Sequence, residues 1–152
     1  MIVADIMTEA SVVDSPKESL RAAAGRMWQQ QTGSLLIMDG DRLVGILTER
    51  DLLRSVARGA DVDATTIGDV MTTSVRTVEA ATPVHEVARL MAAHWIRHLP
   101  VMEGDKVVGV VSQRDLVGVL AALGPKTEGV ELPSDQLVRA RRLARIEQGD
   151  LD

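Results

Sequence analysis

The chain has 152 residues, a formal net charge of −5 and 45% hydrophobic residues, which suits one folded domain or two small halves that share a core. It contains no Cys, Phe or Tyr, which excludes disulfides, thiolate metal sites and cysteine nucleophiles and leaves Trp28 and Trp95 as the only aromatic residues. The acidic balance argues against a protein that coats nucleic acid or an anionic membrane with its whole surface.

No segment is typical of a targeting signal or a membrane span. The N-terminus has no basic region followed by a long apolar run. The longest nearly apolar stretch, Leu116–Leu123, is far shorter than the ~20 residues that cross a bilayer. We therefore expect a cytoplasmic protein.

The sequence repeats itself after 64 residues without a gap. DIMT at residues 5–8 aligns with DVMT at residues 69–72, and residues 35–53 align with residues 99–117, where nine of 19 pairs are identical. This period is longer than the ~20–50 residues of solenoid repeats. It indicates a tandem duplication, with one copy in residues 1–62, a second in residues 63–124, and residues 125–152 outside both.

Each copy predicts the element order β-α-β-β-α. In the first copy we expect strands at Ser11–Asp14, Leu35–Met38 and Leu43–Leu47. We expect one helix that starts near Glu18 or Ser19 and a second helix at Glu49–Ala57. A capping-box pattern at residues 15–18 would start the first helix about a turn earlier, but the repeat alignment favours the later start. In the second copy we expect strands at Val75–Val78 and Val107–Val111 and a helix at Gln113–Leu123. Another helix should follow the first of these strands, with Thr82 as its N-cap and Pro83 as its first residue.

The predicted fold class is α/β (α+β), with two tandem β-α-β-β-α repeats, pseudo-twofold symmetry and a cleft between the halves. A half of ~60 residues is marginal alone, so the two copies should bury apolar faces against each other. After a linker, Ser134 would cap a C-terminal basic helix over Asp135–Gln148. We expect this helix to pack on the module or on a dimer partner. A solvated helix and a helix that contacts nucleic acid are the alternatives.

Two strand-to-helix turns carry the same polar pattern, Thr48 with Asp51 and Ser112 with Asp115. One interpretation is structural, because a hydroxyl followed three residues later by an acid caps a helix start. The other is functional. A carboxylate there can accept hydrogen bonds from a ligand, and the helix start favours an anion.

Together these motifs resemble a tandem pair of CBS domains, the Bateman module. The resemblance rests on DIMT at residues 5–8, GDRLVGILTERDLL at residues 40–53, RHLPV at residues 97–101 and GVVSQRDL at residues 109–116. It covers about residues 1–124. It implies a regulatory module, without catalysis, that binds adenosine-containing ligands in the cleft and often forms a homodimer.

The resemblance also implies a role for individual residues. Asp51 and Asp115 would bind ribose beside Thr48 and Ser112, and Ile46 and Val110 would touch the adenine face. Backbone groups of Val13, Asp14, Thr77 and Val78 would read the adenine edge. Arg97 and His98 would reach a phosphate. The first copy has Gly33 and Ser34 where the second has these basic residues, which predicts two unequal sites.

The expected ligand is AMP, ADP or ATP, with S-adenosylmethionine or NADH as further candidates and Mg²⁺ only alongside a polyphosphate. No catalytic cofactor and no metal site are expected, because His85 and His94 lack ligand spacing. The expected partner is an unidentified regulated protein, with no membrane. The alternatives are a structural pair with vestigial pockets, nucleic-acid contact through the C-terminal helix, and a small hydrolase that uses Asp51 or Asp115 with His98. The sequence contains no phosphate-binding loop motif, which argues against the hydrolase.

Overall fold

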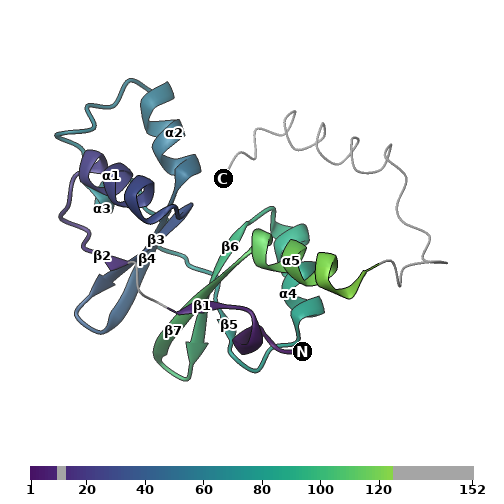
Figure 1. The fold of residues 1–152 in the computed structure, drawn as a ribbon. Helices are drawn as coiled ribbons and strands as arrows, with labels where there is room; N and C mark the ends of the chain where they lie inside the picture. The colour runs from purple at the N-terminus through teal and green to yellow at the C-terminus, as the bar shows by residue number, and fades with distance from the viewer. Residues whose placement is uncertain (10–12, 125–152) are drawn as a thin grey trace. The chain divides into compact units, whose positions relative to one another are not determined.

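The computed structural model describes residues 1–9 and 13–124 (Figure 1). The chain divides into a compact unit, Met1–Leu120, and a second unit, Ala121–Asp152. The first unit holds the first sequence repeat and the second as far as Leu120. The predicted linker and basic helix, with Ser134 and Asp135–Gln148, lie outside the described residues, as does Ser11 of the first predicted strand.

Both repeats fold with the predicted order of elements, so the mixed α/β class with two tandem β-α-β-β-α repeats is confirmed. The first repeat contains β2 (Val13–Asp14), α1 (Leu20–Gln30), β3 (Ser34–Asp39), β4 (Arg42–Thr48) and α2 (Glu49–Ala57). The second contains β5 (Val78–Glu79), α4 (Val84–His94), β6 (His98–Glu103), β7 (Lys106–Ser112) and α5 (Gln113–Leu123). Three short elements were not predicted, namely η1 (Val3–Asp5), β1 (Thr8–Glu9) and α3 (Ile67–Val70).

The strands form two sheets, in the orders β2-β3-β4 and β1-β7-β6-β5. In each repeat a short strand pairs in parallel with the first strand of an antiparallel hairpin. Gly40 and Gly104 turn these two hairpins with φ angles of 60° and 58°. Glycine suits both turns because other residues adopt a left-handed conformation at an energetic cost.

Each repeat sends its N-terminal segment to the hairpin of the other repeat. Strand β1 pairs with β7, with Thr8 opposite Val110. At the equivalent place, Thr72 forms an isolated bridge with Ile46, closed by two backbone hydrogen bonds of 3.0 Å. The segments 5–8 and 69–72 are therefore the straps that join the two halves.

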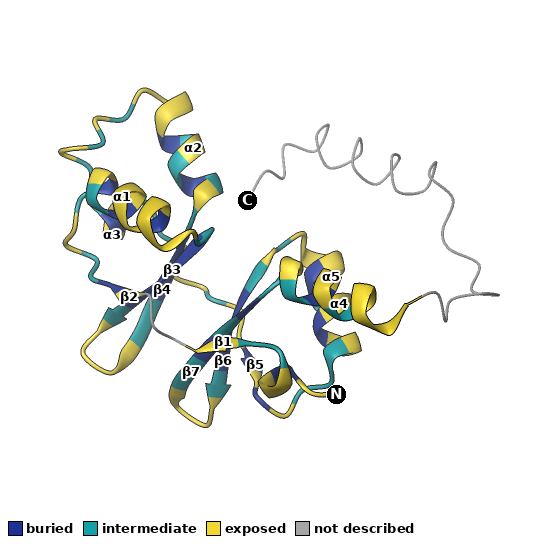
Figure 2. Cartoon of the chain, viewed as in Figure 1, coloured by how far each residue is buried: buried dark blue, intermediate teal, exposed yellow. Residues whose placement is uncertain are grey.

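Two hydrophobic cores lie between the helices and the sheets, as the dark blue segments of Figure 2 show. The first-repeat core consists of Leu20, Ala23, Met27, Leu35, Ile37, Leu47 and Ile67. The second-repeat core consists of Val3, Val78, Ala80, Val87, Met91, Leu99, Val101, Val111 and Leu116. Val3 and Ile67, which lie just before the straps, are each fully buried in the core of the other copy, so these segments add apolar packing to the backbone pairing of the straps.

The helix starts test the predicted caps. Helix α1 begins after Ser19, whose side chain accepts a hydrogen bond from the backbone N–H of Ala22, as the repeat alignment favoured. The prediction for α4 was wrong by one residue. Pro83, not Thr82, is the N-cap, because Pro83 has an extended backbone with ψ of 138°.

The two tryptophans do not fill either core. Trp28, near the end of α1, is 78% exposed. Trp95 ends α4 in a left-handed conformation and is 37% exposed. Within residues 1–9 and 13–124, none of the helices combines the length and apolar character that a bilayer crossing requires.

Two equivalent glycines allow the straps to cross the hairpins. A Cβ atom on Gly109 would lie 2.6 Å from the Thr8 carbonyl oxygen and 2.7 Å from the Met7 sulfur. A Cβ atom on Gly45 would lie 2.4 Å from the Met71 sulfur and 3.1 Å from the Thr72 carbonyl oxygen. At Gly109 a side chain would force the Thr8 backbone to shift, whereas at Gly45 the Met71 side chain would have to move.

Gly109→Ala should therefore destabilise the protein. Backbone atoms must shift to admit the methyl group, which costs about 1–3 kcal/mol in overpacked sites. Gly118→Ala is the matched control, because a Cβ atom at that helical position meets nothing within 4 Å. It should stabilise by up to about 1 kcal/mol through helix propensity. Urea unfolding of both variants measures the difference, and equal stabilities would contradict the assigned crossing.

Candidate functional site

The polar turns at the starts of α2 and α5 have the same geometry. In the first, the backbone N–H and the hydroxyl of Thr48 donate to Asp51 Oδ2 over 2.8 and 2.9 Å. In the second, the same groups of Ser112 donate to Asp115 Oδ2, both over 2.7 Å. Both acids thus stabilise a helix start, and the predicted capping role is confirmed for both turns.

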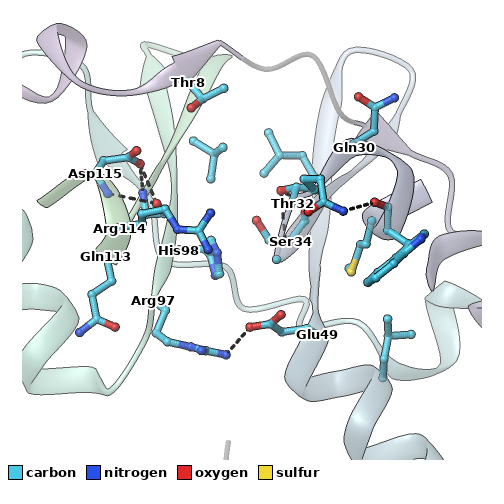
Figure 3. A pocket seen from close by; sticks show the side chains of 18 of the residues that line it. Thr8, Gln30, Thr32, Ser34, Glu49, Arg97, His98, Gln113, Arg114 and Asp115 are labelled. Atoms are coloured by element: carbon cyan, nitrogen blue, oxygen red, sulfur yellow. Dashed lines mark hydrogen bonds and ion pairs between the residues drawn. The ribbon is translucent and has the colours of Figure 1, made fainter. Parts of the chain in front are cut away.

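A pocket of about 950 Å³ lies between the two repeats (Figure 3). This volume is within the range of small-molecule sites. The second repeat contributes Arg97, His98, Val110, Ser112, Gln113, Arg114, Asp115 and Val117. The first-repeat side contributes Thr8, Glu9, Ala24, Met27, Trp28, Gln30, Gln31, Thr32, Gly33, Ser34, Leu36, Glu49 and Leu52. Both halves of the duplication therefore build one site.

The structure brings together five of the predicted site residues. Ser112 and Asp115 lie at the start of α5, and Val110 lies two residues earlier on β7. Arg97 and His98 enter the same pocket from the start of β6. Since side chains two residues apart on a strand share a face, Val110 and Ser112 face the pocket together.

The other predicted residues are not part of this pocket's lining. In the first repeat these are Val13, Asp14, Ile46, Thr48 and Asp51. Ile46 and Asp51 are largely buried, whereas Val13 is 42% exposed on β2. In the second repeat, Thr77 is exposed just before β5, and Val78 is buried in the second-repeat core. Strand β6 separates β5 from β7 in the sheet.

Asp14 is a buried acid with local partners. One oxygen, Oδ1, accepts the backbone N–H of Ser15 over 2.8 Å. The other, Oδ2, lies 3.0 Å from Arg26 Nε, although the angle does not make a hydrogen bond. This ion pair accounts for an acid at a position where the second copy has Val78. The described part of the chain holds no group of three His, Asp or Glu side chains that could bind a metal ion.

Sequence reasoning missed Thr8 and Glu9, which line the pocket from β1. The repeat of the DIMT motif was the available signal. It marked residues 5–8 and 69–72 as equivalent, but not as segments that pair with the hairpin of the other copy. The pocket therefore combines the N-terminal strap of one repeat with the strand-to-helix turn of the other.

The second-repeat side chains fill space that the first repeat leaves open. A Cβ atom on Gly33 would lie 3.1 Å from two atoms of the His98 ring, so His98 packs where Gly33 has no side chain. Beside it, Arg97 Nη2 lies 2.9 Å from Glu49 Oε1. Figure 3 shows these two side chains pointing toward each other across the pocket.

The environment of His98 disfavours its protonated form. Burial is the main cause that lowers the pKa of His98 below its ordinary value of 6.5, and the positive charge of Arg97 adds to it. The carboxylates of Glu49 and Asp115 act in the opposite direction but are outweighed. His98 is therefore mostly neutral at pH values above 6.5.

Stability should depend on pH through His98. As the pH falls below about 6.5, the unfolded chain takes up the proton before the folded chain does. The free energy of unfolding should therefore decrease as the pH falls from the pKa of His98 in the unfolded chain to its lower pKa in the folded chain. Above about pH 6.5 His98 should cause no such decrease. Urea unfolding at several pH values between about 7.5 and 5 measures this. His98→Gln should lose less stability over this range, and parallel profiles would contradict the assignment.

Comparison with known proteins identifies the family. The CBS domain family model matches residues 3–58 and 67–122. CBS domain-containing protein YhcV of Bacillus subtilis is 34% identical over 115 residues, which cover 75% of this chain and 81% of that protein. Hypoxic response protein 1 of Mycobacterium tuberculosis is 34% identical over 114 residues, which cover 74% of this chain and 80% of that protein.

Solved structures agree. A putative signal-transduction protein with CBS domains from Burkholderia ambifaria aligns with a TM-score of 0.76 and 34% identity, over 80% of this chain and 95% of that chain. The CBS domain pair of protein MJ0100, crystallised with 5′-methylthioadenosine and S-adenosylmethionine, aligns with a TM-score of 0.75 and 28% identity, over 80% and 97% of the two chains. The duplicated fold and these matches together show that this chain belongs to the CBS-domain family and carries two CBS domains in tandem.

Proposed function

We propose that the chain is a regulatory module that binds an adenosine-containing ligand in the pocket described above and conveys ligand occupancy to another protein. The observation that supports this most strongly is the position of Asp115 and Ser112, at a strand-to-helix turn inside a pocket of nucleotide size. A related CBS pair that binds 5′-methylthioadenosine and S-adenosylmethionine adds support. The proposal assigns the chain no reaction.

In this proposal Asp115 binds the ribose. Both of its hydrogen bonds from Ser112 end on Oδ2, which leaves Oδ1 outside that capping interaction. A carboxylate oxygen has more than one acceptor site, so Asp115 can cap the helix and accept ribose hydroxyls together. Val110 would lie against the adenine ring. The backbone N–H groups at the start of α5 favour an anionic group nearby.

AMP, ADP or ATP would place phosphate near the basic side chains of the pocket, Arg97 and Arg114, with His98 beside them. Mg²⁺ would enter only with a polyphosphate. The expected signal is a change in how the two repeats sit, because a ligand in contact with both halves stabilises the conformation that fits it best. An unidentified regulated protein would respond to that change.

A second, weaker site would use the equivalent residues of the first repeat, Ile46, Thr48 and Asp51. The backbone segments at Val13–Asp14 and Thr77–Val78 are the candidates for adenine contacts. Asp51 is less suited to ribose than Asp115, since its Oδ1 lies 3.5 Å from Arg54 Nη1. Unequal occupancy of the two sites is therefore part of the proposal.

Thermal-shift titrations test ligand binding. AMP, ADP, ATP, NADH, S-adenosylmethionine and 5′-methylthioadenosine would each be titrated into the wild type and Asp115→Asn. A ligand at about 100 times its dissociation constant stabilises the folded state by about 2.7 kcal/mol. The variant should lose this stabilisation, because an amide lacks the charge that strengthens hydrogen bonds from ribose.

Asp69→Asn is the matched control for that experiment. It removes the same charge from a helix-capping acid, because the backbone N–H and hydroxyl of Thr66 donate to Asp69 Oδ2, but Asp69 lies outside the pocket and outside the second proposed site. It should keep the ligand-induced shift. The absence of any shift with millimolar ligand would overturn the proposal and favour a structural pair with vestigial pockets.

We also propose that the chain forms a homodimer through the exposed faces of α2 and α5. The repeat-equivalent pairs Leu53 and Val117, and Val56 and Leu120, are all more than half exposed. Four large apolar side chains at matching positions of two helices are typical of a surface that a partner covers. The most economical partner is a second copy of the chain, which presents the same surface.

Sedimentation velocity tests the dimer. The wild type should sediment as a species with twice the mass of one chain. Leu120→Glu should shift the protein toward the monomer, because it places a charge in the contact between the two copies. Ala93→Glu on α4, also an exposed position, is the matched control and should leave the mass unchanged. A monomeric wild type would contradict the proposal.

A further inference from the structure

One ion pair joins the two repeats inside the pocket. Arg97 Nη2 and Glu49 Oε1 lie 2.9 Å apart, although the residues are far apart in sequence. Both side chains line the pocket, and they are 42% and 56% exposed. A pair this exposed is weak and open to competition from other ions.

Backbone hydrogen bonds hold the main chain at both Glu49 and Arg97. Glu49 opens α2, and its N–H donates to the Gly33 carbonyl oxygen over 3.0 Å. Arg97 precedes β6, and its carbonyl oxygen accepts the N–H of Gln113 over 2.8 Å. These two bonds are equivalent in the repeat, because Gly33 aligns with Arg97 and Glu49 aligns with Gln113. The symmetric counterpart of the ion pair would join Gly33 to Gln113, so only one such pair can form.

The charges of the pocket are not those of a polyphosphate site. The lining contains three carboxylates, Glu9, Glu49 and Asp115, against two guanidinium groups, Arg97 and Arg114. Arg97 is engaged by Glu49. His98 adds little positive charge at neutral pH, because burial lowers its pKa below 6.5. A phosphate chain that enters this lining meets a net excess of negative charge.

We propose that Glu49 is a specificity-determining residue, which occupies Arg97 and so directs the pocket toward adenosine ligands with little or no negative charge. This inference rests on the proposed function. Arg97 donates to Glu49 through Nη2, so a phosphate that binds the same guanidinium must either replace the Glu49 carboxylate or lie beside it. Each further phosphate adds negative charge next to Glu49, so the penalty grows from AMP to ADP to ATP.

Glu49→Gln tests the inference, because it places in α2 the residue that the second repeat already has at Gln113. The wild type should bind neutral 5′-methylthioadenosine more tightly than ATP, both without Mg²⁺ and at low salt. In Glu49→Gln the affinity for ATP should rise about three- to tenfold, the range expected when one partly exposed unit charge is removed. The affinity for 5′-methylthioadenosine should change less than about twofold, because this ligand carries no phosphate to be repelled.

Two further variants separate a local effect from a general one. Glu79→Gln removes the same charge from an exposed position on β5, outside the pocket, and should leave both affinities unchanged. Glu49→Gln combined with Arg97→Gln should lose the gain in ATP affinity, because that gain depends on a released guanidinium. Thermal unfolding without ligand would show that each variant is folded. Isothermal titration calorimetry would give the affinities.

The outcomes distinguish this inference from the proposed function. If 5′-methylthioadenosine binds the wild type but Glu49→Gln leaves the ratio of the two affinities unchanged, the role of Glu49 is wrong and the adenosine site stands. The role of Glu49 is also wrong if the wild type binds ATP more tightly than 5′-methylthioadenosine. If no adenosine ligand binds either protein, the proposed function fails and this inference fails with it.

Discussion

The structure depends on the close approach of two straps to two strands. The segments 5–8 and 69–72 cross β7 and β4 at Gly109 and Gly45, where a Cβ atom would meet the Thr8 carbonyl group at Gly109 and chiefly the Met71 side chain at Gly45. This approach places Val3 and Ile67 in the opposite cores. It also brings β1 to the edge of the second sheet, where Thr8 and Glu9 become part of the pocket. Fold and site therefore follow from the same contact.

Much of the fold could be predicted because the duplication doubles every local signal. The bounds of α2 and α5 agree with the predicted ranges, since each helix starts at a polar turn that the sequence displays twice. The alignment also favoured a start of α1 near Glu18 or Ser19, against a competing pattern at residues 15–18, and Ser19 is the N-cap. Local patterns failed at Pro83, where either of two neighbouring residues can cap a helix and the backbone conformation decides.

The site was predictable only where it is local. The residues of each pair, Thr48 with Asp51 and Ser112 with Asp115, lie three positions apart, so the first turn of the helix alone determines their geometry. The contacts of Glu49 with Arg97 and of Gly33 with His98 depend on how the two repeats pack, which no short pattern encodes. Asp14 shows the same limit, because its partner Arg26 lies on the following helix.

The crossed straps also constrain how the chain is made. Thr8 pairs with Val110, so the N-terminal segment leaves the ribosome roughly a hundred residues before its partner strand. Until β7 has been synthesised, β1 has no strand to pair with, and the core that Val3 enters is incomplete. Contacts between residues so distant in sequence slow folding, because a long loop must close before they form. A nascent chain can build the core of the first repeat only once Ile67 has emerged, and it can complete the second only once Leu116, near the start of α5, has emerged.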